Sequence, residues 1–155
     1  MNQDEIIKII GPTNFPIAFG GYNSDNFDID CEIYNFIIFD GKHAPDEIIT
    51  HGSKILKISH GNLSYTNSEY LIHYENIEII QDNQWELKML ISKIQKKRNI
   101  LFSASAKNAL VESQLALSKA KNALQYDDPF VSCWIKSGVI SLIDSILFQN
   151  QILPN

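Results

Sequence analysis

Two aspartates separated by one residue, Asp28 and Asp30, are the residues of this chain best suited to chemistry. They open an apolar run that reads as a β-strand, where side chains two positions apart share a face at a spacing of about 6.6 Å. Mg²⁺ in proteins usually takes one or two carboxylates together with phosphate oxygens of a substrate. The sequence therefore predicts a magnesium site with Asp28 and Asp30 as its ligands.

Two glycines, Gly20 and Gly21, lie between the apolar segment 15–19 and these acids. Because glycine lacks a Cβ atom, backbone N–H groups at such a turn can come close to a phosphate. The ordinary alternative is a plain turn with solvated acids, since Asn, Ser and Asp side chains readily bond to nearby backbone. A calcium loop fits less well, because the spacing lacks the internal glycine and the closing glutamate of such loops.

The segment 19–31 resembles the signature of the nucleotidyltransferase superfamily. That signature is an apolar residue, two small residues, a spacer and an acid-apolar-acid-apolar quartet, which here reads Asp28-Ile29-Asp30-Cys31. The spacer 22–27 is shorter than the family's, so we expect its phosphate-binding helix to be shortened or lost. The resemblance covers about the first half of the chain.

The resemblance implies a role for each matching residue. The two acids hold Mg²⁺ on a nucleoside triphosphate, the glycine turn binds the phosphates, and a third acid comes from a neighbouring strand. Glu75 is the first candidate for that third acid and Glu78 the second. The implied site residues are Asp28, Asp30 and Glu75 for catalysis, Asp28 and Asp30 for the metal, and Gly20, Gly21 and Ser24 for the nucleotide.

Composition restricts the class of protein. A chain of 155 residues, 45% hydrophobic and 20% charged, is expected to form one globular domain, or a small domain with an appendage. The first five residues carry acids, and no stretch appears as long as a membrane span, so a cytoplasmic protein is predicted. A net charge of −5 argues against a broad nucleic-acid surface. Both cysteines are predicted to be buried thiols.

The fold class predicted from the sequence is α+β, with a small mixed β-sheet domain over residues 1–83. Apolar runs bounded by Gly, Asn and Ser turns predict the elements of this domain. They are an amphipathic helix over 4–10, strands over 15–19, 28–40, 54–60 and 69–82, and a short helix or loop over 45–50.

Residues 84–155 are predicted to form a helical domain. Apolar residues three and four positions apart predict helices at about 84–99, 100–126 and 129–149. The short Asp127-Asp128-Pro129 connection makes the last two an antiparallel hairpin. This hairpin resembles the HEPN module that often accompanies minimal nucleotidyltransferases. HEPN ribonucleases carry an Arg and a His on a late helix, and this chain has neither beyond Arg98, so ribonuclease activity is not expected.

Two functions from different classes follow from these features. In the first, the chain transfers a nucleotide from a nucleoside triphosphate to an acceptor in the presence of Mg²⁺. In the second, the same fold is catalytically inactive and forms a homo-oligomer, or binds a protein partner, through its helices. The intact Gly-Gly and Asp-Ile-Asp elements favour the first function. The short spacer, the poorly defined third acid and the single arginine favour the second.

Overall fold

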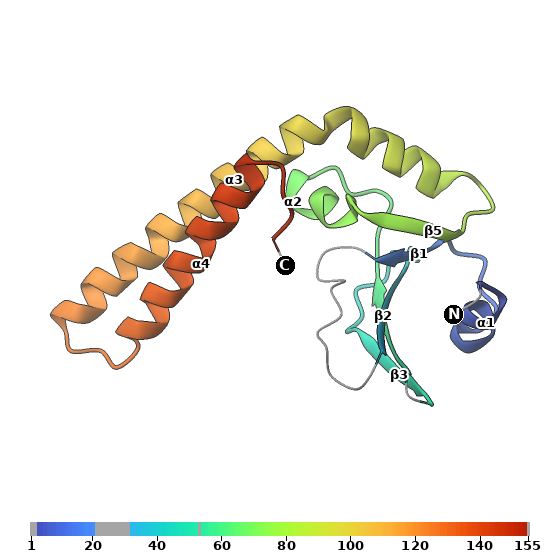
Figure 1. The fold of residues 1–155 in the computed structure, drawn as a ribbon, viewed down its shortest axis with the longest axis horizontal. Coiled ribbons are helices and arrows are strands. Elements are labelled where there is room, and N and C mark those ends of the chain that lie inside the picture. Colours follow the sequence, from blue (N-terminus) through green and yellow to red (C-terminus); the bar gives the residue numbers. More distant parts are fainter. Residues whose placement is uncertain (1–2, 21–31, 53, 155) are drawn as a thin grey trace. The chain divides into compact units, whose positions relative to one another are not determined.

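The computed structural model describes residues 3–20, 32–52 and 54–154 (Figure 1). The chain divides into two compact units. The sheet unit comprises the chain up to Thr66 together with His73–Lys96, and the hairpin unit comprises Asn67–Ile72 together with Lys97–Pro154. A mixed sheet followed by two long helices confirms the predicted α+β class.

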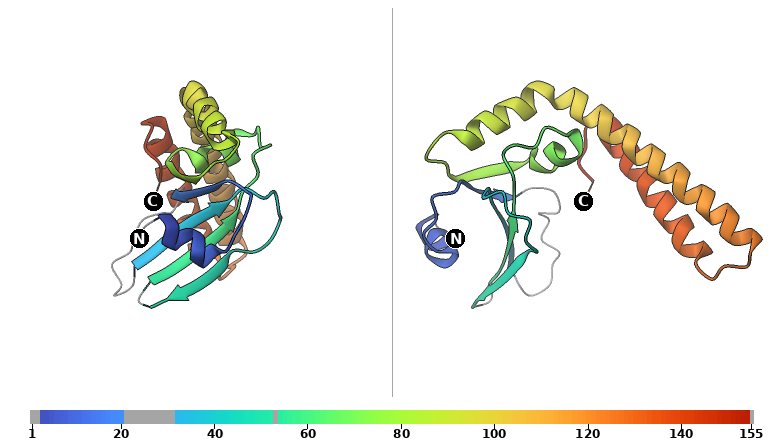
Figure 2. Two further views of the ribbon diagram at one scale, coloured as in Figure 1. Left: turned by 90° about the vertical axis from the view of Figure 1, so that its right-hand side faces the viewer. Right: turned by 180° about the vertical axis from the view of Figure 1, so that it is seen from behind.

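The sheet unit contains a mixed five-stranded sheet in the order β3-β4-β2-β1-β5 (Figure 1; Figure 2, left). Strands β2 and β4 run parallel, with Glu32 opposite Lys54, and the other neighbouring pairs are antiparallel. The apolar run at the end of β2 is buried on both faces, because this strand lies inside the sheet. The strands are β1 Ile17–Gly20, β2 Glu32–Ile38, β3 Glu47–His51, β4 Lys54–His60 and β5 Ile77–Gln81.

The core of the sheet unit includes contacts between the helix α1, Gln3–Ile10, and the sheet. Ile6 of α1 is buried with Phe36 of β2 and Leu56 of β4. Ile9 and Ile10 pack against the same cluster, so the apolar stripe predicted for this helix faces the core.

The prediction of a helix or loop over residues 45–50 is wrong, because these residues contribute to the edge strand β3. Ile48, Ile49 and Thr50 are β-branched and suit a strand. Four of the five side chains of β3 are exposed, since β3 pairs with β4 alone. Without a buried face there is no alternation of apolar and polar residues from which to recognise the strand.

The strand predicted over residues 69–82 is wrong in its first half. The chain there forms a short helix α2, Ser68–Leu71, and a 3₁₀ turn η1, Ile72–Tyr74, before β5 begins. Leu71 and Ile72 are both buried. A short buried apolar run does not distinguish a strand from a helical turn, which is why the prediction failed.

The helix α3, Glu86–Gln125, is continuous over 40 residues, so the two helices predicted over 84–99 and 100–126 are one. No Gly or Pro occurs between its ends. Asn99, the predicted end of the first helix, costs only about 0.7 kcal/mol relative to alanine inside a helix, which is too little to interrupt it. The helix α3 begins in the sheet unit and continues through the hairpin unit.

The helix α4, Val131–Gln149, runs antiparallel along the second half of α3 (Figures 1 and 2). Small residues line the contact between the two helices. The Ser113 hydroxyl donates to the Gly138 carbonyl at 2.8 Å, and the Ser145 hydroxyl donates to the Ala106 carbonyl at 2.8 Å. A Cβ atom built on Gly138 would lie 3.1 Å from Cγ of Leu117, so glycine permits close packing here.

We expect Gly138→Val to lower the free energy of unfolding by about 1.5 kcal/mol, because the added methyl groups would press against Leu117 and the Ser113 carbonyl. Ser137→Val is the matched control. Ser137 is exposed on the same turn, so its substitution should change stability by less than about 0.5 kcal/mol. Urea unfolding followed by circular dichroism measures both, and equal stabilities would contradict the close packing.

Candidate functional site

Two of the six predicted site residues, Gly20 and Glu75, lie in the part of the chain that the structure describes. The other four, Gly21, Ser24, Asp28 and Asp30, lie outside the described residues. The proposed roles of these four therefore remain sequence predictions.

Gly20 is the last residue of β1 and lies next to β5. Its backbone pairs with Ile77, and its φ angle is +95°. A Cβ atom built on Gly20 would lie 2.8 Å from the carbonyl oxygen of Asn76. Both the positive φ angle and this close approach require glycine at this position. The packing of β1 on β5 thus accounts for the residue type without a phosphate ligand.

Glu75 lies in the turn before β5 rather than on a strand. It is at the same end of the β1–β5 pair as Gly20, because Ile77 is the partner of Gly20. Strand β5 pairs with β1 and lies two strand spacings, roughly 10 Å, from β2. Glu78, the second candidate for a third acid, is an exposed residue of β5 opposite Phe19.

The strands on either side of β2 are β1 and β4. Over their described residues, which read Ile-Ala-Phe-Gly and Lys-Ile-Leu-Lys-Ile-Ser-His, neither carries a carboxylate. Within the described ranges, no three His, Cys, Asp or Glu side chains come together as a metal site would require.

A buried carboxylate–imidazole pair that the sequence analysis did not predict lies beyond the end of β2. Asp40 follows β2, and His60 ends the parallel strand β4. Nδ1 of His60 lies 3.0 Å from Oδ1 of Asp40, and it donates, since an ionised carboxylate only accepts. The two side chains are 6% and 3% exposed. Nε2 of His60 lies 3.9 Å from a carboxylate oxygen of Glu47 on β3.

The surroundings of Asp40 favour its ionised form. Burial raises the pKa of this carboxyl group, but hydrogen bonds from the Lys42 backbone and from His60 lower it further than burial raises it. The Lys42 ammonium also lies 3.3 Å from Oδ2 of Asp40. The net effect is an Asp40 pKa below its ordinary value. The pair therefore ties the loop after β2 to the end of β4.

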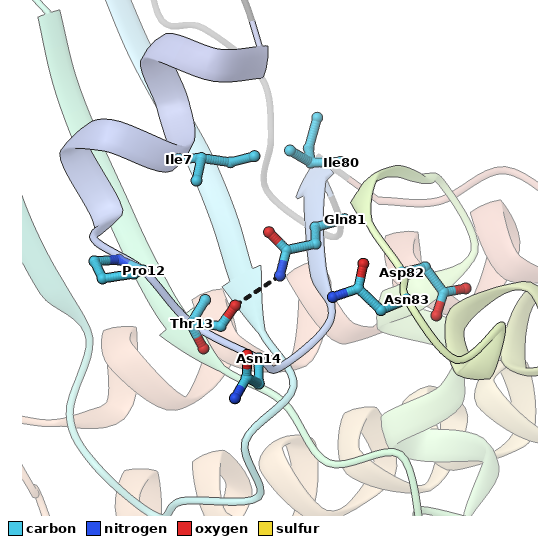
Figure 3. A pocket seen from close by; sticks show the side chains of 8 residues that line it. All are labelled: Ile7, Pro12, Thr13, Asn14, Ile80, Gln81, Asp82 and Asn83. Carbon is cyan, nitrogen blue, oxygen red and sulfur yellow. Dashed lines mark hydrogen bonds between the residues drawn. The ribbon is translucent and has the colours of Figure 1, made fainter.

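A pocket of about 740 Å³ lies at the opposite end of β5 from Gly20 (Figure 3). Ile7 and Ile80 point toward each other at one side, and the Gln81 side-chain amide donates to the Thr13 carbonyl at 2.8 Å. Asp82 also lines the pocket, and its carboxylate accepts a hydrogen bond from the Lys88 backbone N–H at 3.0 Å and so caps the start of α3. The pocket contains none of the predicted site residues.

In the hairpin unit, α4 packs Gly138 and Phe148 toward α3 and exposes large aliphatic residues. Besides Ile140 and Ile143, four of these residues are spaced four, three and four positions apart, so the four share one side of the helix. Each is 41–56% exposed. We call this set the α4 ridge; it consists of Ile135, Val139, Leu142 and Ile146.

Leucines of α3 recur every seven residues beside the α4 ridge. We call Leu110, Leu117 and Leu124 the leucine row; Leu110 and Leu124 are exposed, and Leu117 is half-buried. A groove of about 500 Å³ lies between α3 and α4 on this side. It is lined by Leu117 and Leu124 from the leucine row and by Val131 and Ile135 from α4. Gln114, Ser118 and Lys121 also line it, so the hairpin presents an aliphatic ridge next to a groove of mixed polarity.

Two sequence predictions about α4 are wrong. This helix is long and apolar enough to cross a membrane by length and composition alone, whereas no such stretch was predicted. Cys133, predicted to be a buried thiol, is exposed. Cys133 is exposed because α4 buries one narrow side against α3 and leaves most of its surface open.

No protein-family model matches this sequence, and no curated protein matches it. Among solved structures, the chain is similar to a nucleotidyltransferase-like protein from Exiguobacterium sibiricum 255-15, with 14% sequence identity and a TM-score of 0.45. The alignment covers 99% of this chain and 58% of that chain, so this chain spans a little over half of the other protein's length. A likeness at this level assigns no activity.

Proposed function

We propose that this chain is a protein-binding module, in which the helical hairpin makes the contact and the sheet unit carries out no chemistry. The observation on which this proposal rests is the orientation of α4, which exposes the aliphatic α4 ridge and buries Gly138 and Phe148. Soluble proteins that act alone rarely leave a large continuous apolar patch in water. A partner that covers the ridge would remove this surface from solvent.

Features of the sheet unit support binding over catalysis. The two strands beside β2 lack a carboxylate over their described residues, and Glu75 precedes a strand two places away from β2. Gly20 has a structural reason to be glycine. The resemblance of the hairpin to HEPN modules remains a prediction.

A second candidate function is magnesium-dependent transfer of a nucleotide from a nucleoside triphosphate to an acceptor. It rests on the segment 20–30, which joins the antiparallel neighbours β1 and β2 and places Asp28 and Asp30 shortly before a buried strand. In this function the two acids would hold Mg²⁺, and Gly20, Gly21 and Ser24 would bind the triphosphate. Bound Mg²⁺ would supply charge neutralisation at the phosphates.

Calorimetric titration with ATP, GTP, CTP and UTP in the presence of Mg²⁺ distinguishes the two functions. We expect no magnesium-dependent binding by the wild-type chain at concentrations up to about 1 mM, a range that covers typical substrate affinities. The Asp28→Asn, Asp30→Asn double variant should behave in the same way. Asp25→Asn, in the same spacer but outside the motif, serves as the control.

Binding by the wild-type chain and by Asp25→Asn, lost in the double variant, would overturn the proposal in favour of nucleotide transfer. The next step would then be a search for the acceptor. Circular dichroism of each variant confirms that a loss of binding does not come from a loss of fold.

A further inference from the structure

We propose that the partner of the hairpin is a second copy of this chain. Each copy packs its α4 ridge into the groove beside the leucine row of the other, around a two-fold axis. This inference rests on the proposed function and names its partner. It gives a role to the α4 ridge, the leucine row and the groove together.

The shape of the hairpin surface is self-complementary. A two-fold interface uses the same patch on both subunits, so one patch must supply both the protruding and the receiving surface. The α4 ridge protrudes, and the groove between α3 and α4 receives. The ridge is aliphatic, and the groove contains Leu117, Leu124 and Val131 beside polar Gln114, Ser118 and Lys121, so the ridge of one copy matches the aliphatic part of the groove of another.

The spacing of these residues predicts a helical partner. The α4 ridge advances by four, three and four residues, and the leucine row by seven, which are the intervals of a heptad repeat. Helices with this pattern pack side by side at a crossing angle of about 20°. Two such hairpins would form a four-helix bundle. A second copy supplies the required pair of helices.

The charges on the hairpin agree with an uncharged partner surface. Lys136 and Asp144 are the charged residues of α4, and neither belongs to the α4 ridge. Electrostatic recognition of an acidic or basic partner needs a surface that carries the opposite charge. The α4 ridge and the leucine row carry no charge, and Lys121 is the charged residue that lines the groove, so a largely uncharged surface fits this side of the hairpin best.

The size of the hairpin approaches that of a standard dimer interface. With 19 residues, α4 is roughly 28 Å long at 1.5 Å per residue. Two adjacent helices are roughly 20 Å wide, so this side of the hairpin covers about 560 Å² in projection. Side-chain relief brings its accessible surface toward the roughly 800 Å² per partner of a standard interface.

A lipid bilayer fits the same surface less well, although α4 is long enough to cross one. The serine hydrogen bonds described above tie α4 to α3, so α3 would enter the bilayer with it. Charged residues in the hydrocarbon region cost several kcal/mol each. In the hairpin unit, α3 carries the charged residues Lys97, Arg98, Lys107, Glu112, Lys119 and Lys121.

Sedimentation velocity of the full chain over a concentration series tests the proposal. We expect the wild type to sediment as two 17.6 kDa chains at micromolar concentration. Val139→Asp, in the middle of the α4 ridge, should raise the dimer dissociation constant at least about 30-fold, because it places a charge in the buried centre of the interface. Ser137→Asp adds the same charge two residues away on another side of α4 and should change it less than about threefold.

A second substitution keeps the test independent of folding. Leu142→Gln nearly preserves side-chain volume and should also weaken dimerisation, while circular dichroism and thermal unfolding report whether each variant folds. A wild-type chain that stays monomeric at about 100 µM would have a dimer dissociation constant too high for a stable dimer, and this result would overturn the second-copy proposal. So would equal effects of Val139→Asp and Ser137→Asp.

The proposed function and this inference fail in different ways. A monomer that also lacks magnesium-dependent nucleotide binding would overturn the second copy and leave the protein-binding module standing. A monomer that co-sediments with phosphatidylcholine vesicles through α4, in a manner lost in Val139→Asp, would overturn the second copy in favour of a membrane surface. A dimer that binds nucleotide through Asp28 and Asp30 would overturn the proposed function alone.

Discussion

The Gly20→Ala variant is expected to lose about 3 kcal/mol of unfolding free energy relative to the wild type. A φ angle of +95° is strained for alanine. The added Cβ atom would also lie 2.8 Å from the carbonyl oxygen of Asn76. That oxygen belongs to the backbone leading into β5, so it has no side-chain rotation by which to move away. Urea unfolding followed by tryptophan fluorescence measures the loss.

Gly11→Ala is the matched control, because Gly11 has a φ angle of +90° but no atom within 4 Å of its built Cβ. It should lose about 1 kcal/mol, which reports the backbone strain alone. The difference between the two variants then reports the close approach of β1 to Asn76. Equal losses would contradict that approach. A Gly20→Ala chain as stable as the wild type would instead favour the predicted role of Gly20 in nucleotide binding.

Gly20 also illustrates what a sequence can reveal about a site. A glycine after an apolar run identifies a position with an unusual backbone requirement, and the structure bears this out. The requirement comes from Asn76, which is 56 residues away in the chain. Its origin depends on which strand lies beside β1, and the sequence does not contain that information in local form.

Strand prediction succeeded or failed according to burial. The strand predicted over 54–60 has the observed bounds of β4. Its side chains include buried and exposed positions, Gly52 lies two residues before its start, and Gly61 directly follows its end. The edge strand β3 exposes most of its side chains and was missed. The segment 70–74 is short and, apart from His73, apolar or aromatic, so it fits a strand as well as the helical turns it forms.

The Asp40–His60 pair likewise depends on which strands lie next to each other. The parallel pairing of β2 with β4 brings Asp40 and His60 together, although they are 20 residues apart. Along an unbroken strand, Asp40 is too far from Asp28 to share a metal with it, and the structure gives it a different partner. An aspartate directly after a buried strand was the signal available in the sequence, but its partner could be identified only once the strand order was known.

We expect Asp40→Ala to lower the free energy of unfolding by about 2 kcal/mol at pH 7, since His60 would lose its hydrogen-bonded partner in a buried position. Asp46→Ala is the control. Asp46 pairs with Lys57 at 2.9 Å, but its side chain is 44% exposed, so its loss should cost less than about 0.5 kcal/mol. Urea unfolding at a fixed ionic strength measures both variants.

The Asp40→Ala substitution should also change how the free energy of unfolding depends on pH. Because the folded-state pKa of Asp40 lies below its ordinary value of 3.8, its contribution to stability is present above pH 3.8 and is lost as the pH falls through the folded-state pKa. The stability difference between the wild type and Asp40→Ala should therefore shrink as the pH falls below about 4. A difference that stayed constant from pH 7 to pH 3 would contradict an ionised Asp40 in the folded chain.

A His60 variant completes the test of the Asp40–His60 pair. If Asp40 stabilises the chain through His60, then Asp40→Ala and His60→Ala remove the same interaction, and the double variant should lose less than the two single losses combined. The expected coupling is about 1 kcal/mol or more, as for residues in direct hydrogen-bonded contact. Additive losses would mean that Asp40 acts through Lys42 instead, whose backbone N–H lies 3.1 Å from the carboxylate. Asp40 would then stabilise the turn after β2 rather than the junction of β2 with β4.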